Sequence, residues 1–165
     1  MRRVLFRSLT LVFGRDELTF EETPILNVAP YREPAAEPVV WRKAIEMDLG
    51  GPHKVTGFAA LREVGSTTHA GFALFRRGRL IEGSADESYR PEQIFGKSNS
   101  YTFQRLFGEL HLSGFDVSHT KDGFRWEEHE ELFLELLESE LKAAPMNLLD
   151  QAEGYRAKQH KRARD

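Results

Sequence analysis

The polar segment from Ser118 to Phe124 contains the residues whose types and spacing best suit ligand binding. It reads Ser-His-Thr-Lys-Asp-Gly-Phe and lies between an apolar segment and an amphipathic one. Lys121 precedes a turn-forming Asp122-Gly123 pair, and a lysine on such a loop can reach a phosphate as a compact positive charge. The segment therefore predicts a phosphate-contacting loop, and the competing interpretation is an ordinary solvated lysine.

Three other basic motifs carry weaker signals. Arg76-Arg77-Gly78-Arg79 has the donors to clamp a phosphate, or simply keeps a hairpin tip soluble. Gly96-Lys97-Ser98 matches the end of a phosphate-binding loop but lacks its upstream glycine, whose backbone freedom aims N–H groups at the phosphates. The basic segment Lys158–Arg164 either contacts nucleic acid or forms a polar terminus.

Residues for other chemistries are missing or wrongly spaced. The sequence has no cysteine, which excludes disulfides, thiolate zinc sites and a cysteine nucleophile. His119 and His129 match no zinc-binding spacing, and no Gly-x-Ser-x-Gly motif is present. The acidic stretch Glu127–Glu140 is typical of a solvated helix face. An independent enzyme therefore has the least support.

Length and composition indicate one ordinary globular domain. The chain has 165 residues, of which 40% are hydrophobic and 30% charged, and its net charge is −3. This charge argues against nucleic-acid binding by the whole surface. The sequence has no apolar run long enough to span a membrane and no convincing signal peptide, so we expect a cytoplasmic protein without membrane contact.

Several strands are expected ahead of the Ser118–Phe124 segment. Residues 4–20 predict a hairpin that turns at 14–16, and residues 23–38, with four of the seven prolines, predict an irregular segment. Further strands are expected at Val39–Leu49, Lys54–Glu63 and Gly71–Phe75, the last forming a hairpin with Leu80–Ile81.

The later part of the chain predicts helices as well. Residues 83–99 indicate an exposed loop, and Tyr101–Leu112 fits both helical and strand spacing. Trp126–Lys142 is the strongest helix, with an apolar stripe of Phe133, Leu137 and Leu141, and Pro145 ends it. A second helix begins at Met146.

Together these elements predict an α+β fold with a mixed or antiparallel sheet and helices on one face. We expect one α+β domain over residues 1–145, with its irregular segment at 23–38. Residues 146–165 then form a C-terminal helix and a basic tail.

Two stretches, in this order, resemble the second domain of ATPases of the gyrase–histidine kinase–MutL (GHKL) superfamily, and of the MORC type in particular. Residues 71–81, Gly-Phe-Ala-Leu-Phe-Arg-Arg-Gly-Arg-Leu-Ile, are similar to a glycine–apolar-strand–turn–Arg-Leu-Ile hairpin of those proteins. Residues 107–112, followed by 118–124, are similar to their strand and Thr-x-Lys-x-x-Phe-like loop. The resemblance covers about residues 54–142 and implies a transducer domain with a ribosomal-protein-S-five-like fold. It also implies a strand at Leu106–Leu112.

The resemblance assigns a role to the Ser118–Phe124 segment. In that family a lysine on the transducer loop reaches the terminal phosphate of ATP in the neighbouring domain, and Lys121 matches it. The resemblance implies that Lys121 is the catalytic, phosphate-sensing residue, because its contact exists only while the γ-phosphate remains. The resemblance also implies that His119 and Thr120 lie near the phosphate. Asp122, Gly123 and Phe124 are expected to shape the loop. Phe124 and Trp126 are expected to pack beneath the loop.

The nucleotide pocket of that family is not found in this sequence. Its asparagine-bearing helix and Asp-x-Gly-x-Gly loop are missing, and Asp48-Leu49-Gly50-Gly51 lacks the required spacing. We therefore expect ATP and Mg²⁺ to be held by an N-terminal nucleotide-binding domain, in cis or in trans, with none bound directly by this chain. Homodimer formation is a further expectation. The alternative is a stand-alone module that binds protein or nucleic acid.

Overall fold

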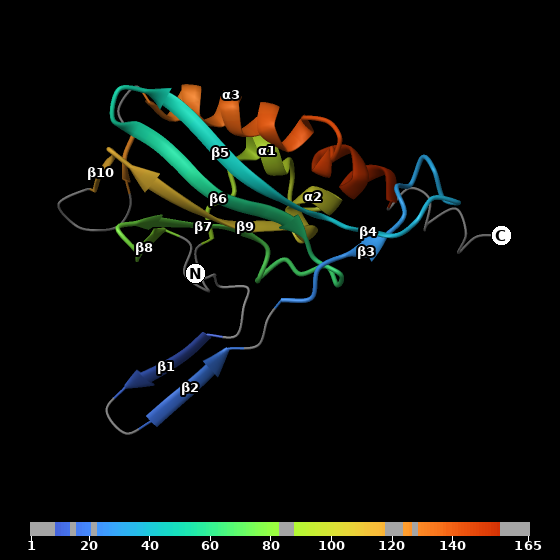
Figure 1. The fold of residues 1–165 in the computed structure, drawn as a ribbon, viewed down its shortest axis with the longest axis horizontal. Coiled ribbons are helices and arrows are strands. Elements are labelled where there is room, and N and C mark those ends of the chain that lie inside the picture. Colours follow the sequence, from blue (N-terminus) through green and yellow to red (C-terminus); the bar gives the residue numbers. More distant parts are fainter. Residues whose placement is uncertain are drawn as a thin grey trace.

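A mixed five-stranded sheet forms the centre of the molecule in the computed structural model, which describes residues 9–13, 16–20, 23–82, 88–117, 124–126 and 129–155. The strands follow the order β5-β6-β9-β7-β8, and β7 and β9 are parallel while the other neighbours are antiparallel. Figure 1 shows the helices on one face of this sheet. The predicted α+β class is therefore confirmed. The strands of the sheet are β5 (Arg42–Gly50), β6 (His53–Leu61), β7 (Gly71–Arg76), β8 (Arg79–Glu82) and β9 (Leu106–Ser113).

Three smaller two-stranded sheets accompany the central one. They are β1 (Leu9–Phe13) with β2 (Asp16–Phe20), β3 (Asn27–Val28) with β4 (Val39–Val40), and β10 (Asp116–Val117) with β11 (Phe124–Arg125). The first pair confirms the hairpin expected in residues 4–20. The second pair lies at the two ends of the proline-rich segment, which is otherwise irregular as predicted.

The helices are α1 (Glu92–Phe95), α2 (Tyr101–Arg105), α3 (His129–Lys142) and a further helix over residues 148–155. α3 buries the predicted stripe of Phe133, Leu137 and Leu141 against the sheet. Its N-terminus differs from the prediction, because Trp126 lies before the helix rather than within it. Among the helices that the structure describes, none is long and apolar enough to cross a membrane.

Two predictions for the region between β8 and β9 need correction or refinement. Residues 83–99 were expected to form an exposed loop, but α1 lies within them and buries Ile94 and Phe95 in the core. Tyr101–Leu112 forms both a helix and a strand, which explains why it fits both spacings. α2 occupies its first five residues, and β9 follows directly. The strand at Leu106–Leu112 is therefore confirmed.

Two glycines allow β6 and β9 to approach closely at the centre of the sheet. A Cβ on Gly57 would lie 2.0 Å from the Glu109 carbonyl oxygen, and a Cβ on Gly108 would lie 2.2 Å from the Phe58 carbonyl oxygen. Either side chain would force the two strands apart. The hydrophobic core is therefore built on two strands that only glycine allows to come this close.

Lys43 of β5 closes the C-terminal end of α3. Its Nζ atom donates to the carbonyl oxygens of Glu140, Ala143 and Met146 at 2.5, 2.9 and 3.0 Å. The ammonium group thus lies against carbonyl oxygens of the last turn of α3 and of the segment that follows it, where the helix dipole favours positive charge. Partial burial lowers the pKa of Lys43.

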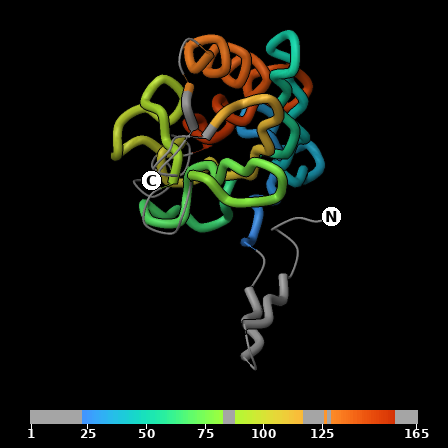
Figure 2. The backbone as a smooth tube through the Cα atoms, turned by 90° about the vertical axis from the view of Figure 1, so that its left-hand side faces the viewer, coloured from blue at the N-terminus to red at the C-terminus, as the bar shows by residue number. Residues whose placement is uncertain are grey.

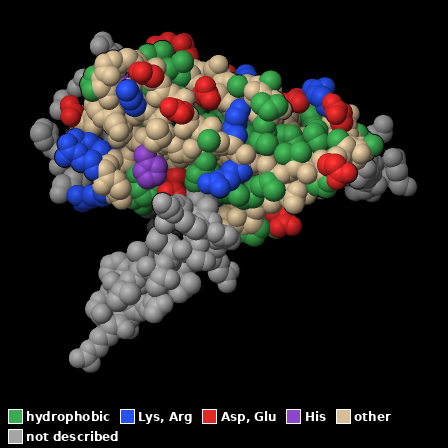
Figure 3. Space-filling view, in the orientation of Figure 1, with side chains coloured by type: hydrophobic (Ala, Val, Ile, Leu, Met, Phe, Trp, Pro, Cys, Tyr) green, Lys and Arg blue, Asp and Glu red, His purple; other side chains and the backbone are tan. Residues whose placement is uncertain are grey.

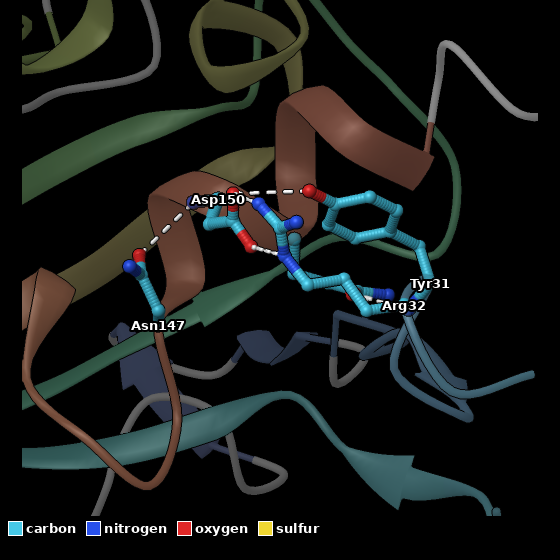
Figure 4. Close-up of polar contacts among 5 residues, drawn as sticks. Tyr31, Arg32, Asn147 and Asp150 are labelled. Atoms are coloured by element: carbon cyan, nitrogen blue, oxygen red, sulfur yellow. Dashed lines mark hydrogen bonds and ion pairs between the residues drawn. The ribbon is translucent and has the colours of Figure 1, made fainter.

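Polar contacts fasten the proline-rich segment to the helix over residues 148–155, and we call them the Tyr31 junction. Its members are Tyr31, Arg32 and Asp150, which Figure 4 labels, and Gln151. The Tyr31 hydroxyl donates to Asp150 Oδ1 at 3.1 Å, and Arg32 donates to both carboxylate oxygens at 2.9 and 3.0 Å. The Tyr31 backbone N–H donates to Gln151 Oε1. Leu148 and Ala152 of the same helix enter the core, so the junction joins the proline-rich segment to the body of the fold.

Candidate functional site

The connection that contains Lys121 joins two short paired strands. Asp116 pairs with Arg125 and Val117 with Phe124, so β10 and β11 form the two legs of a hairpin. His119, Thr120, Lys121, Asp122 and Gly123 lie outside the described residues, and the backbone of Phe124 belongs to β11. The roles predicted for these residues stay predictions, but the start and end of their loop are fixed by the two strands.

Six aromatic rings pack where this hairpin joins the fold, and we call them the aromatic base. Phe115, which is 1% exposed, directly precedes β10, and Trp126 directly follows β11. Their ring centroids are 5.8 Å apart, and Trp126 lies 4.9 Å from Phe133 of α3. Trp126 thus packs against rings of the core next to β11, and its position relative to residues 118–123 lies outside the described part of the chain. The members are His53, Tyr89, Phe115, Trp126, His129 and Phe133.

The remaining rings of the aromatic base come from elements far apart in sequence. Tyr89 stacks on Trp126 at 5.7 Å and donates its hydroxyl to Glu130 Oε1 at 3.4 Å. Burial, followed by the nearby Glu130 carboxylate, raises the pKa of Tyr89, so this phenol stays protonated. His53 and His129 lie with their ring centroids 4.2 Å apart. The hairpin is thereby tied to β6, α3 and the segment before α1 at once.

The arginine-rich turn between β7 and β8 lies at the same end of the sheet as the hairpin. β7 and β9 are parallel, with Phe75 beside His111, so both strands end on the same side. Figure 2 views this end, with the β7–β8 turn and the exit from β9 toward the viewer. Arg77 and Gly78 have φ values of 52° and 77°, as the tight two-residue hairpin turn requires. The predicted β7–β8 hairpin is therefore confirmed.

The arginines of this turn are available for binding. The side chains of Arg76, Arg77 and Arg79 make no hydrogen bond or ion pair with another described residue, and Arg77 and Arg79 are exposed. Figure 3 shows Lys and Arg side chains gathered at the left end of the molecule, over the β7–β8 turn. The β7–β8 turn and the paired strands β10 and β11 therefore lie at the same end of the sheet.

Gly96-Lys97-Ser98 has a structural setting of its own between α1 and α2. Gly96 ends α1 with a φ of 69°, and the Ser100 hydroxyl donates to the Phe95 carbonyl while accepting from the Phe103 N–H. α1 has only four residues. Gly96-Lys97-Ser98 therefore forms a tight connection between two short helices and does not have the geometry of a phosphate-binding loop.

A hollow of about 360 Å³ lies on the face of the sheet opposite the helices. Its lining includes Glu46 and Asp48 from β5 and Lys54 and Thr56 from β6. Two carboxylates against one ammonium repel a polyphosphate, so this hollow does not suit a nucleotide. Within the described ranges, no three His, Cys, Asp or Glu side chains come together to hold a metal ion.

One polar pair on the sheet was missed by the sequence reasoning. Glu109 is 4% exposed, and its carboxylate lies 3.5 Å from His111 Nε2, whose ring stacks on Phe75 with centroids 4.9 Å apart. The alternation of Leu106, Leu110 and Leu112 could have placed both residues on the opposite face of β9. Nothing in the sequence indicated that this face would bury a carboxylate.

Comparison with known proteins does not assign the chain to a family. No family model matches the chain, and no curated protein matches it.

Proposed function

We propose that this chain is the transducer domain of a GHKL-type ATPase of the MORC kind and acts in the cytoplasm. A separate nucleotide-binding domain, in cis or in trans, holds ATP and Mg²⁺. Lys121 reaches the terminal phosphate from the β10–β11 hairpin. Loss of that phosphate on hydrolysis then releases the hairpin and changes how the two domains contact each other.

The observation that supports this proposal most is how the Lys121 loop is held. β10 and β11 pair with each other. Phe115, directly before β10, and Trp126, directly after β11, both belong to the aromatic base. Because β10 and β11 are held in this way, a ligand contact made by the residues that connect them would act on α3 and β6. The exposed arginines of the β7–β8 turn, at the same end, add positive charge that favours a polyphosphate.

The aromatic base also supplies the coupling that a transducer needs. Trp126 contacts Phe133 of α3, and His53 contacts His129. A displacement of the hairpin therefore acts on the N-terminal end of α3 through direct ring contacts. The order of motifs in the GHKL resemblance agrees with this arrangement, since the β7–β8 hairpin and β9 precede the loop.

The test is ATP turnover by the native assembly that contains this chain together with its nucleotide-binding domain. Lys121→Ala removes the phosphate-sensing charge, and we expect kcat to fall at least tenfold, within the range that such cationic contacts contribute to phosphoryl transfer. Lys97→Ala is the matched control, because it removes a lysine from the α1–α2 link without touching the hairpin. Equal turnover in the two variants would refute the assignment of Lys121.

A different result would favour the stand-alone binding module. If the native assembly contains no ATPase and the chain alone binds nucleic acid with a strong salt dependence, the basic turn or the tail is the binding element. Removal of Lys158–Asp165 then separates the two, because it abolishes binding only if the tail carries it.

A further inference from the structure

β5 is an edge strand, and its outer side is open for pairing. It has nine residues and pairs with β6 on one side only. No described residue pairs with the opposite side of β5. Arg42, Ala44, Glu46 and Asp48 are exposed on the face opposite the helices. A long unpaired edge presents backbone donors and acceptors that another strand can use.

The side chains of β5 are complementary to themselves. In an antiparallel pair of two β5 strands related by a two-fold axis at Ile45, Arg42 lies opposite the partner's Asp48. Ala44 then lies opposite the partner's Glu46. Opposite charges directly across two strands stabilise the pair. A two-fold axis at Glu46 would place the Glu46 carboxylates of the two copies opposite each other. An axis at Ala44 would pair Arg42 with Glu46 but would leave Asp48 without an opposite charge.

α3 lies alongside β5 and runs antiparallel to it. Its C-terminal end lies at Lys43, through the hydrogen bonds to Glu140 and Ala143. Its N-terminal end lies at His53, which pairs with Gly50. Figure 1 shows α3 alongside β5. The C-terminal half of α3 therefore lies beside Ile45, and its N-terminal half lies beside the later part of β5.

Two leucines lie outside the buried stripe of α3, on one flank of the helix. Glu130 contacts Tyr89 and lies three residues before Phe133, on the same side of α3 as the buried stripe. At about 100° per residue, Leu132 and Leu136 lie roughly 140° and 100° from Leu137 at the centre of that stripe, both on one flank. Leu132 is 40% exposed, and Leu136 is half-buried. Leucines outside the buried stripe of a helix that lies alongside an open edge strand are what a second copy would cover.

We propose that the β5 edge and the Leu132–Leu136 flank of α3 bind a second copy of this chain. The two sheets become continuous across a two-fold axis at Ile45, and the two α3 helices lie antiparallel above the joint. Such an isologous contact uses the same surface on both copies, as closed dimers do. The interface lies within this chain and does not depend on the proposed ATPase function.

Disulfide trapping tests the pairing and its register, and the absence of native cysteines makes the readout clean. Ala44→Cys and Glu46→Cys are prepared as two separate chains, both at exposed positions, and then mixed under oxidising conditions. Residues directly opposite in antiparallel strands have Cα atoms about 4.5–5.5 Å apart, within reach of a disulfide, whereas diagonal neighbours are farther apart. We expect a crosslinked dimer in the mixture and much less with either chain alone. Efficient crosslinking of Ala44→Cys alone, or none in the mixture, would overturn the proposal.

Sedimentation of the full chain provides the second measurement. We expect a concentration-dependent rise from 18.9 kDa toward twice that mass. Leu132→Lys should weaken the dimer roughly tenfold or more without unfolding the chain, because this side chain is exposed in the monomer. Val64→Lys, at a hydrophobic residue that is 67% exposed and lies outside the β5–α3 surface, is the matched control. A wild-type chain that stays at 18.9 kDa at every concentration would refute the second copy as occupant and leave the edge to a different partner.

Discussion

The aromatic base and the Tyr31 junction both fasten an irregular segment to the body of the fold, but by different forces. The aromatic base holds the β10–β11 hairpin by packing of rings, with Phe115 1% exposed. The Tyr31 junction holds the proline-rich segment by hydrogen bonds from Tyr31 and Arg32 to Asp150. These contacts lie near the surface, since the Arg32 side chain is 68% exposed. Salt screens an exposed ion pair but does not screen the packing of apolar rings such as Phe115. The segment proposed to read a ligand is thus the one with the firmer attachment.

The largest effect should come from the aromatic base. Phe115→Ala removes a fully buried ring beneath the hairpin, and we expect a loss of about 3–4 kcal/mol in the free energy of unfolding. Urea denaturation measures it. Phe75→Ala is the control, since Phe75 is only partly buried on the other face and should cost clearly less. Equal losses would mean that the hairpin is held by something other than this packing.

A smaller effect is expected where Tyr31 lies on Gly154. A Cβ on Gly154 would come within 2.2 Å of the Tyr31 ring. Without a clash, replacing glycine by alanine inside a helix stabilises it by about 1 kcal/mol. A loss in the free energy of unfolding would therefore indicate the clash with Tyr31. We expect Gly154→Ala to destabilise the chain by roughly 1–2 kcal/mol. In a Tyr31→Ala background the same substitution should stabilise it, and destabilisation in both backgrounds would contradict the contact.

The smallest effect belongs to the ion pair of the Tyr31 junction. Its hydrogen bond from Arg32 lowers the pKa of Asp150. A carboxyl group with a lowered folded pKa contributes stability above its unfolded pKa of about 3.9, and that stability is lost as pH falls through the folded value. Asp150→Asn should cost about 0.5–1 kcal/mol at neutral pH and low salt.

Thermal unfolding at neutral and acidic pH checks this prediction. The difference between wild type and Asp150→Asn should shrink as pH falls below about 3.9 and as salt is added. A difference that is constant across pH would show that the charge of Asp150 has no part in the Tyr31 junction.

The sequence predicted those parts of the fold that local pattern determines. The Phe133, Leu137 and Leu141 stripe specified α3, and the Gly78 turn specified the β7–β8 hairpin. α1 was missed because four residues are too few to show a helical period, although Ile94 and Phe95 were available to suggest burial. Tyr101–Leu112 was ambiguous because helix and strand meet there without an intervening turn.

The candidate site was less accessible to sequence reasoning. The Lys121 loop could be named from its residue types and from the family resemblance. The aromatic base could not, because His53, Tyr89 and Phe115 meet only after β6, β9 and α3 have assembled. The Tyr31 junction likewise joins residues 119 positions apart, a distance at which no local pattern remains.

The most direct test of the central claim is the ratio of ATP turnover between Lys121→Ala and Lys97→Ala in the native assembly. Both substitutions remove one positive charge, and only the first lies on the connection between β10 and β11. A Lys121 that senses the γ-phosphate predicts at least a tenfold lower kcat for Lys121→Ala and near wild-type turnover for Lys97→Ala. A ratio close to one would contradict the claim that this hairpin reads the nucleotide.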